Sequence, residues 1–386
     1  MELNDTDLSE RGKTPMKTNA VTLPGEHIRE ELEAREWAQR DLAYILGWSD
    51  QEVNMTLSGR RKITPEAAKA LGDAFNVPAE LFVNMQRAYD LSQAREPDPG
   101  IAERSRIQSV YPVREMIRRG WFEDSEPGLL VAQFVRFFEV GDLSRVPHLS
   151  HLAKKSGDYR EETNPKQLAW LFRVHHIAKS MDVPAFSEKK LRELLPTLRY
   201  LMVDPDDIRQ VPKLLANCGV RFVVVEFLPN AKIDGVCCWL DSQSPILGMS
   251  LRHDRIDNFW FTLHHEIEHI LRRAGVSRPI IDEDLSGGLD DSLPAEEQAA
   301  NLAAAERCVP VKELDNFILR KDPYISERDV LGFAKVQQVH PGIVIGQIHA
   351  RKKNFRFLSK HLVKVREIVI SSAICDGWGK IYPVQL

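Results

Sequence analysis

The stretch NFWFTLHHEIEHILRRA, residues 258–274, contains the motif on which the fold prediction depends. His265 and His269 are four residues apart, so on a helix both lie on one face and can present imidazole nitrogens to a single metal ion. Glu266 lies about 100° around that helix from His265, where it could touch a water on the metal as a general base without being a ligand. Apolar residues flank the motif, and a buried helix needs a reason to keep two histidines and a glutamate. The motif therefore predicts a metal site that carries out hydrolysis.

Two histidines are too few for a catalytic zinc site, which takes three protein ligands and leaves one position for water. The next helical stretch, AEEQAAN at 295–301, offers Glu297 as the third ligand. Asn301 faces the same way and could orient an imidazole by a hydrogen bond. His340, which precedes Pro-Gly at an expected strand entry, could approach the site as a further donor. We expect one zinc ion per chain.

Simpler explanations of these residues remain open. The spacing of the two histidines can arise by chance, and His264 with Glu268 could form a pair on a helix surface. Glu296 and Glu297 could be acids that the helix dipole favours in a first turn after Pro294.

The pattern around the motif divides the chain into regions. Residues 216–386 predict an α+β domain, because short β-branched or aromatic runs precede two helices. Residues 101–215 are amphipathic at helical spacing and predict a helical connecting domain. The stretch 92–100, with two prolines and a glycine, predicts a linker, and the polar residues 1–20 predict a flexible arm. The expected strands lie within 219–228, 235–241 and 244–251.

Residues 21–95 predict five short helices that include a helix–turn–helix DNA-binding domain. In QRDLAYILGWSDQEVNMTLSGRR, residues 39–61, Ala43 is small where the two helices would cross and Gly47 allows the turn. A monomer would read one half-site, so we expect a homodimer on an inverted-repeat operator. The residues predicted to contact DNA are Gln39 at a phosphate, Asp50, Gln51 and Asn54 in the major groove, and Arg60 and Arg61 at phosphates.

Charge and composition restrict these predictions. The 386 residues carry a net charge of −4, which argues against nucleic acid coating the whole chain. Residues 20–95 hold nine Lys and Arg against twelve Asp and Glu, a balance of −3, so a helical bundle for protein contacts is the alternative for this domain. Five cysteines without a CxxC pair disfavour a disulfide framework, and no run of 18 apolar residues predicts a membrane span. We expect a cytoplasmic protein with no membrane partner.

Two stretches together resemble the ImmA/IrrE family of bacterial and phage metallopeptidases: FWFTLHHEIEHIL and EEQAANLAAAERCVP. The resemblance extends to YPVREMIRRGWF, GVCCWLD, SLRHDRIDNFWFTL and HPGIVIGQI. It implies a zincin-like, gluzincin-like domain with zinc on His265, His269 and Glu297 and with Glu266 as the base. Ala299 stands where the family often has Glu, so Glu297 is the better ligand and Glu296 the fallback.

The first 91 residues are similar to the HigA-type antitoxins of the XRE helix–turn–helix class, through LPGEHIREELEAREWAQRDLAYILGWSDQEV and GRRKITPEAAKALGDAFNVPAELFVNMQRAYDL. The two resemblances together imply a stress-response transcription regulator or antitoxin that binds operator DNA. Its zinc endopeptidase domain would hydrolyse a protein partner, a repressor or a toxin-like protein. The alternative is a catalytically silent antitoxin or repressor that binds a toxin, with the peptidase-like domain as a sensor or docking module.

Overall fold

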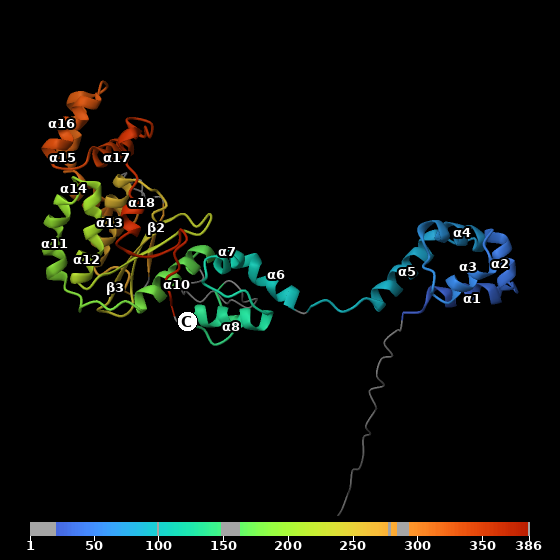
Figure 1. Ribbon diagram of the computed structural model, residues 1–386. Coiled ribbons are helices and arrows are strands. Elements are labelled where there is room, and N and C mark those ends of the chain that lie inside the picture. Colours follow the sequence, from blue (N-terminus) through green and yellow to red (C-terminus); the bar gives the residue numbers. More distant parts are fainter. Residues whose placement is uncertain (1–20, 99, 148–162, 277–278, 284–292, 385–386) are drawn as a thin grey trace, which may run out of the picture. The chain divides into compact units, whose positions relative to one another are not determined.

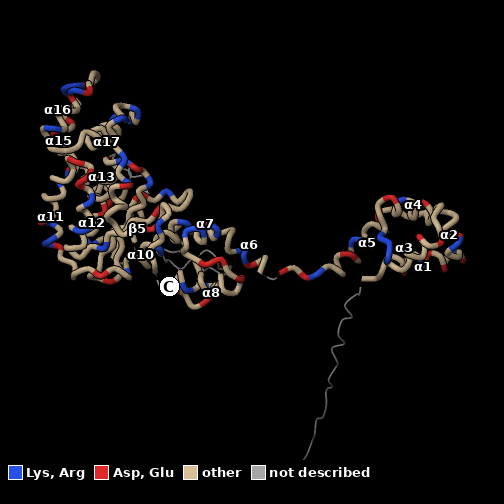
Figure 2. The backbone as a smooth tube through the Cα atoms, in the orientation of Figure 1, with Lys and Arg blue, Asp and Glu red and all other residues tan. Residues whose placement is uncertain are grey.

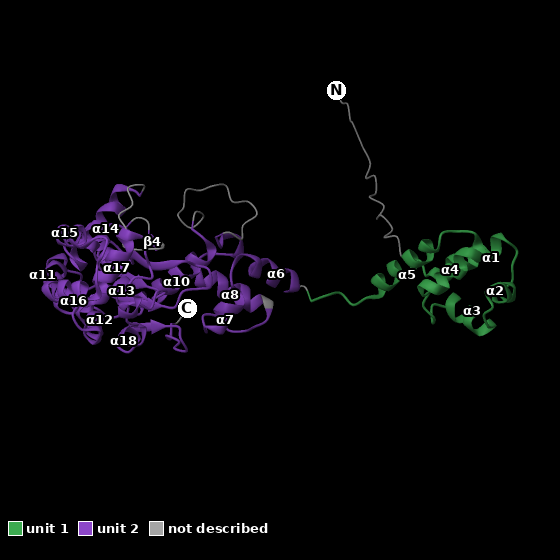
Figure 3. Cartoon of the chain, turned by 90° about the horizontal axis from the view of Figure 1, so that it is seen from above, with its two compact units in different colours: residues 1–98 green, residues 99–386 purple. Residues whose placement is uncertain are grey.

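The computed structural model describes residues 21–98, 100–147, 163–276, 279–283 and 293–384, so the arm predicted over 1–20 lies outside the described residues. The chain has two compact units, Met1–Asp98 (unit 1) and Pro99–Leu386 (unit 2) (Figure 3). The division falls within the stretch 92–100. Over the described ranges, no helix combines the length and the apolar character that crossing a bilayer requires.

Unit 1 is a bundle of helices around one apolar core, as the sequence predicts (Figure 1). Gly47 ends the second helix with φ 66°, a left-handed conformation that glycine adopts without strain. Ser49 begins the third helix by accepting a hydrogen bond from the Glu52 amide, while Glu52 accepts one from the Ser49 amide. The helices are α1 (Pro24–Ala34), α2 (Gln39–Leu46), α3 (Asp50–Leu57), α4 (Pro65–Phe75) and α5 (Ala79–Gln93).

Unit 2 is a mixed sheet with helices on both faces (Figure 1). Its helices are α6 (Gly100–Val110), α7 (Val113–Arg118), α8 (Pro127–Phe137), η1 (Leu143–Arg145), α10 (Pro165–Lys179), α11 (Glu188–Tyr200), η2 (Pro205–Gln210), α12 (Val211–Asn217), α13 (Ile256–Leu271), α14 (Ala295–Cys308), α15 (Val311–Lys321), α16 (Glu327–Gln337), α17 (Pro341–Lys352), η3 (Ser359–His361) and α18 (Arg366–Ile370). Its strands are β1 (Arg221–Val225), β2 (Ile233–Trp239), β3 (Pro245–Met249), β4 (Ile280–Glu283) and β5 (Ile374–Asp376).

The sheet has the order β4-β2-β3-β1-β5. Strand β1 is parallel to β3 and β5, whereas β2 is antiparallel to β3 and β4. The three strands predicted from the sequence are β1, β2 and β3. The sequence did not predict β4 and β5, which are only four and three residues long and therefore too short to show a periodic pattern.

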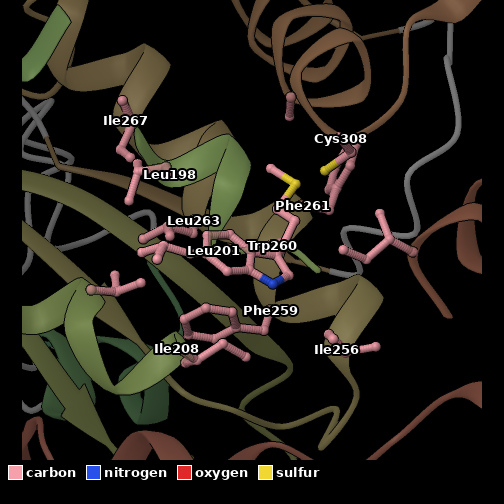
Figure 4. Packing of buried hydrophobic residues seen from close by; sticks show 14 of the residues in the cluster. Leu198, Leu201, Ile208, Ile256, Phe259, Trp260, Phe261, Leu263, Ile267 and Cys308 are labelled. Atoms are coloured by element: carbon pink, nitrogen blue, oxygen red, sulfur yellow. The ribbon is translucent and has the colours of Figure 1, made fainter. Parts of the chain in front are cut away.

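Helix α13 lies in the larger of the two apolar clusters of unit 2. All of its residues from Phe259 to Leu271 are buried. Figure 4 shows Trp260 and Leu263 of this helix beside Leu198 and Leu201 of the α11 region, with Cys308 from the end of α14 close by. Because apolar neighbours surround α13, the polar residues of its motif are held in the interior.

The helices before residue 215 pack on the opposite face of the same sheet. Side chains of β1 alternate, with Phe222 and Val224 in the cluster around α13 and Val223 and Val225 in a second cluster with the helices α6, α8 and α10. A sheet with parallel strands buries both faces, which is why the segment predicted as a separate connecting domain over 101–215 shares one unit with the sheet.

A buried ion pair joins these helices to the last strand. Arg173 of α10 and Asp376 of β5 are both nearly inaccessible, and Arg173 Nε donates to Asp376 Oδ2 at 3.0 Å. The Trp121 indole donates to the other carboxylate oxygen at 3.0 Å. One aspartate therefore connects three segments that are far apart in the sequence.

Replacement of Asp376 should destabilise unit 2. Asp376→Ala leaves the Arg173 cation buried without its partner, and such losses cost about 3–5 kcal/mol in the free energy of unfolding. Glu193→Ala removes an acid from an exposed pair with Lys189 and is the matched control, with a change below about 0.5 kcal/mol. Urea unfolding followed by circular dichroism measures both. Equal midpoints for the two variants would contradict the role assigned to Asp376.

Candidate functional site

The two histidines of the motif point at one another in the interior. Neither His265 nor His269 is exposed, and their Nε2 atoms lie 2.9 Å apart. Their spacing on α13 places both rings on one face of the helix, as the motif predicts. Two imidazole nitrogens converge there on a single point.

Helix α14 brings a carboxylate to the same point. Glu297 Oε2 lies 3.3 Å from His265 Nε2, and Glu297 Oε1 lies 3.5 Å from His269 Nε2. Glu296, the fallback ligand, is exposed. The guanidinium of Arg307 holds α14 against α13, because it donates to the His264 carbonyl at 3.2 Å and also to Glu268.

A second carboxylate reaches the site from strand β4, and sequence reasoning missed it. Asp282 Oδ2 lies 3.4 Å from His265 Nε2 and 3.9 Å from His269 Nε2. One donor atom from each of Asp282, Glu297 and the two histidines lies within 4.8 Å of the other three. The only sequence signal for Asp282 is an acid that follows two isoleucines at the start of an acidic run, which occurs in many chains without a site.

The chemistry of these four residues, the metal cluster hereafter, fits a divalent cation. Asp282 Oδ2 is buried without a hydrogen-bond partner, which is costly unless a cation binds it. Although burial alone would lower it, the pKa of His265 rises to about 9 because Asp282 and Glu297 lie beside the ring. Burial alone would raise the pKa of Glu297, but the hydrogen bonds from both histidines hold it well below its usual value. Two imidazoles and two carboxylates suit zinc, and also iron or manganese.

Glu266 lies next to the metal cluster without belonging to it. The side chain is fully buried, and neither carboxylate oxygen has a hydrogen-bond partner. A Cβ on Gly235 of β2 would come within 2.1 Å of Glu266 Oε1, so only glycine leaves room for this carboxylate. Burial, and then the charges of Asp282 and Glu297, raise the pKa of Glu266 well above its usual value.

Two further residues predicted at the site, Asn301 and His340, do not have the surroundings that the sequence predicts. Asn301 is buried on α14, but the Nδ1 atoms of both histidines lack hydrogen-bond partners, so Asn301 does not orient either imidazole in this structure. His340 caps the start of helix α17 and does not enter a strand, and its Nδ1 accepts a hydrogen bond from the Gly342 amide at 3.1 Å. The strand prediction was wrong because Pro341 at the first position of a helix reads the same as a turn.

The predicted DNA-contacting residues lie on the surface of unit 1. Gln39 is the first residue of α2, after Ala38 as the cap. On α3, the helix expected to enter the major groove, Val53 and Leu57 are buried. The exposed positions at this motif are Gln39, Asp50, Gln51, Asn54 and Arg60.

The two arginines after α3 differ in their surroundings. Arg60 is exposed, whereas Arg61 lies over the Trp48 ring at 4.7 Å and pairs with Glu52 at 2.8 Å. This pairing neutralises one of the two acids of the recognition helix. Acidic and basic residues occur together along unit 1 (Figure 2), so a DNA contact here depends on a few side chains.

Comparison with known proteins bears on unit 1. Residues 28–82 match the family HTH_3, described as a helix-turn-helix. Neither the curated proteins nor the solved structures gave a match. The chain therefore contains an XRE-type helix–turn–helix domain, which supports a DNA-binding transcription regulator.

Loss of a histidine should abolish metal binding. The full chain should purify with about one divalent ion, measured by plasma mass spectrometry, and His265→Ala or His269→Ala should lose it because the remaining ligands hold zinc poorly. Glu297→Ala should weaken binding, whereas the neighbouring Glu296→Ala should not. A His265→Ala/His269→Ala variant that keeps a full equivalent of metal would end the assignment.

Proposed function

We propose that this DNA-binding transcription regulator is also a zinc-dependent endopeptidase that cleaves a protein partner. The observation that supports the proposal is the convergence of His265, His269 and Glu297 beside the buried carboxylate of Glu266. The helix–turn–helix domain on the same chain makes a regulatory protein, such as a repressor or a toxin-like protein, the proposed substrate.

In this proposal His265, His269 and Glu297 hold the zinc ion. Zinc at such a site lowers the pKa of a water molecule and polarises a peptide carbonyl. Glu266 accepts the proton of that water and then delivers it to the leaving amine. The position of Glu266 suits this role, because no hydrogen bond ties its carboxylate to another task.

The electrostatic repulsion between Glu266 and the neighbouring carboxylates also affects whether Glu266 can act as a base. The carboxylates of Asp282, which is buried, and of Glu297, which is partly exposed, lie near the fully buried carboxylate of Glu266. A divalent cation would offset their mutual repulsion and lower the pKa of Glu266, which favours the ionised carboxylate that a base needs.

A second candidate function rests on the number of protein donors in the metal cluster. Four protein donors surround one point, and only Glu297 among them has appreciable solvent exposure, 20% of its side chain. Structural zinc sites have four protein ligands. A catalytically silent regulator, with the metal domain as a sensor or as a docking module for a toxin, is the alternative.

For the N-terminal domain we propose operator binding as a homodimer. Gln51 and Asn54 are exposed and carry amides that can read adenine edges in the major groove. A dimer would place two copies of α3 on an inverted repeat.

Glu266→Gln should keep the metal and abolish hydrolysis. The carboxamide cannot accept a proton, so cleavage should fall by a factor of about 10²–10⁴. The measurement is mass spectrometry of a peptide library incubated with full-length zinc-loaded protein, and Glu296→Gln is the matched control. Equal cleavage by Glu266→Gln and wild type would contradict the mechanism, and absence of cleavage by zinc-loaded wild type and zinc-loaded Asp282→Ala alike would favour the second candidate function.

Arg60→Ala should weaken DNA binding to all sequences alike. Loss of one phosphate contact should reduce the slope of log affinity against log salt by about 0.9. Gln51→Ala should instead reduce the sequence preference, with a loss of about 1–3 kcal/mol in the free energy of binding to the preferred site. Fluorescence anisotropy with operator DNA from its own promoter measures both.

The control for this experiment is Arg87→Ala on α5, which packs against α1 and α4. Arg61→Ala is unsuitable, because loss of the contacts with Trp48 and Glu52 should also lower the melting temperature. If Arg60→Ala and Arg87→Ala leave the same salt slope as wild type, the protein-contact interpretation of the domain stands.

A further inference from the structure

Strand β4 occupies the edge of the sheet beside the metal cluster. It pairs antiparallel with β2, and Asp282 lies opposite Gly235, the residue that makes room for Glu266. The register shifts between Ile233 and Gly235. Without β4, strand β2 would be the edge, and its backbone amides and carbonyls would be free to pair with an extended peptide.

The side chain of Asp282 closes the metal cluster. Its Oδ2 atom lies 3.4 Å and 3.9 Å from the Nε2 atoms of His265 and His269, and it comes from strand β4, whereas Glu297 comes from helix α14. Catalytic zinc sites keep one position for water, and here a fourth protein donor stands within reach of it.

A four-ligand structural site would not explain Glu266. That carboxylate is fully buried without a hydrogen-bond partner, at a cost that a structural zinc site has no reason to bear. The metal cluster therefore has four protein donors, and next to it lies a buried glutamate without a hydrogen-bond partner. Both observations are explained if the site is built for hydrolysis but its water position is blocked by a protein ligand.

We propose that β4 is an internal inhibitory strand, with Asp282 as a fourth metal ligand and the edge of β2 covered against substrate. This proposal rests on the proposed peptidase function. The enzyme is latent while β4 is paired, and it becomes active when β4 leaves β2 and removes Asp282 from the metal.

The length and burial of β4 suit a strand that can separate from β2. It has four residues, and both Ile280 and Ile281 are only half-buried, whereas every residue of β2 and β3 is buried. In the described part of the chain Asp282 Oδ2 has no hydrogen-bond partner and lies beside the His265 and His269 rings, so a bound metal ion would be the main attachment of that oxygen. Short edge strands with few buried contacts open at low free-energy cost.

The test uses the full chain loaded with cobalt(II), whose visible spectrum reports its ligands, and acetohydroxamate as a small chelating probe. Wild type should bind the probe poorly. Asp282→Ala should retain cobalt and bind acetohydroxamate at least about tenfold more tightly, because a coordination position is vacant. Glu296→Ala should behave as wild type.

A second variant keeps all four ligands and loosens only the strand. Ile281 contacts the apolar cluster on the face of the sheet covered by α10, so Ile281→Asp should weaken the pairing of β4 and increase probe binding. Peptide cleavage should rise in both variants relative to wild type.

The outcomes separate the two proposals. Wild type that binds acetohydroxamate as tightly as Asp282→Ala and Ile281→Asp would overturn the inhibitory strand and leave the peptidase proposal intact. Wild type that takes up no cobalt, with no change in its spectrum, would overturn the metal site on which both proposals rest. Tighter probe binding by either variant without any peptide cleavage would retain Asp282 as a ligand and reject latency of a peptidase.

Discussion

The structure of unit 2 depends on the meeting of two imidazoles and two carboxylates at one buried point. Asp282 and Glu297 come from two different elements, β4 and α14, and their carboxylates lie beside the rings of His265 and His269 on α13. Buried carboxylates that face one another are unfavourable, and a shared divalent cation is the usual compensation. The cation would therefore join α13, α14 and β4 as well as supply chemistry. Arg307, which joins α14 to α13 through Glu268 and the His264 carbonyl, supports the same arrangement.

The sheet makes that arrangement possible. Helix α13 can keep a polar motif in the interior because its other faces pack against apolar residues such as Leu198 and Leu201, and because the sheet is covered on its second face by α10. Gly235 then allows Glu266 to approach the backbone of β2. A single added methyl group at that position would collide with the carboxylate, so Glu266 and strand β2 are fitted to each other.

Local patterns in the sequence predicted the parts of the fold that are regular and long. The helix–turn–helix followed from Gly47 and the apolar positions around it, and α13 followed from the spacing of His265 and His269. Asp282 could not be predicted, because a four-residue strand has no periodicity and its pairing with β2 is a long-range contact. His340 was misplaced for a related reason, since Pro-Gly after a histidine begins a helix as readily as it begins a turn.

One measurement tests the central claim that this cluster is a metal centre built from imidazoles and carboxylates. Zinc-edge X-ray absorption on the full chain should show two imidazole nitrogens and carboxylate oxygens at about 2.0–2.2 Å, with no sulfur. Burial, and then the charge of Glu266, raise the pKa of the Cys237 thiol, on the sheet face that packs against α13, well above its usual value, so a thiolate at the metal is not expected. A sulfur shell at about 2.3 Å, or oxygen ligands alone without imidazole scattering, would contradict the account.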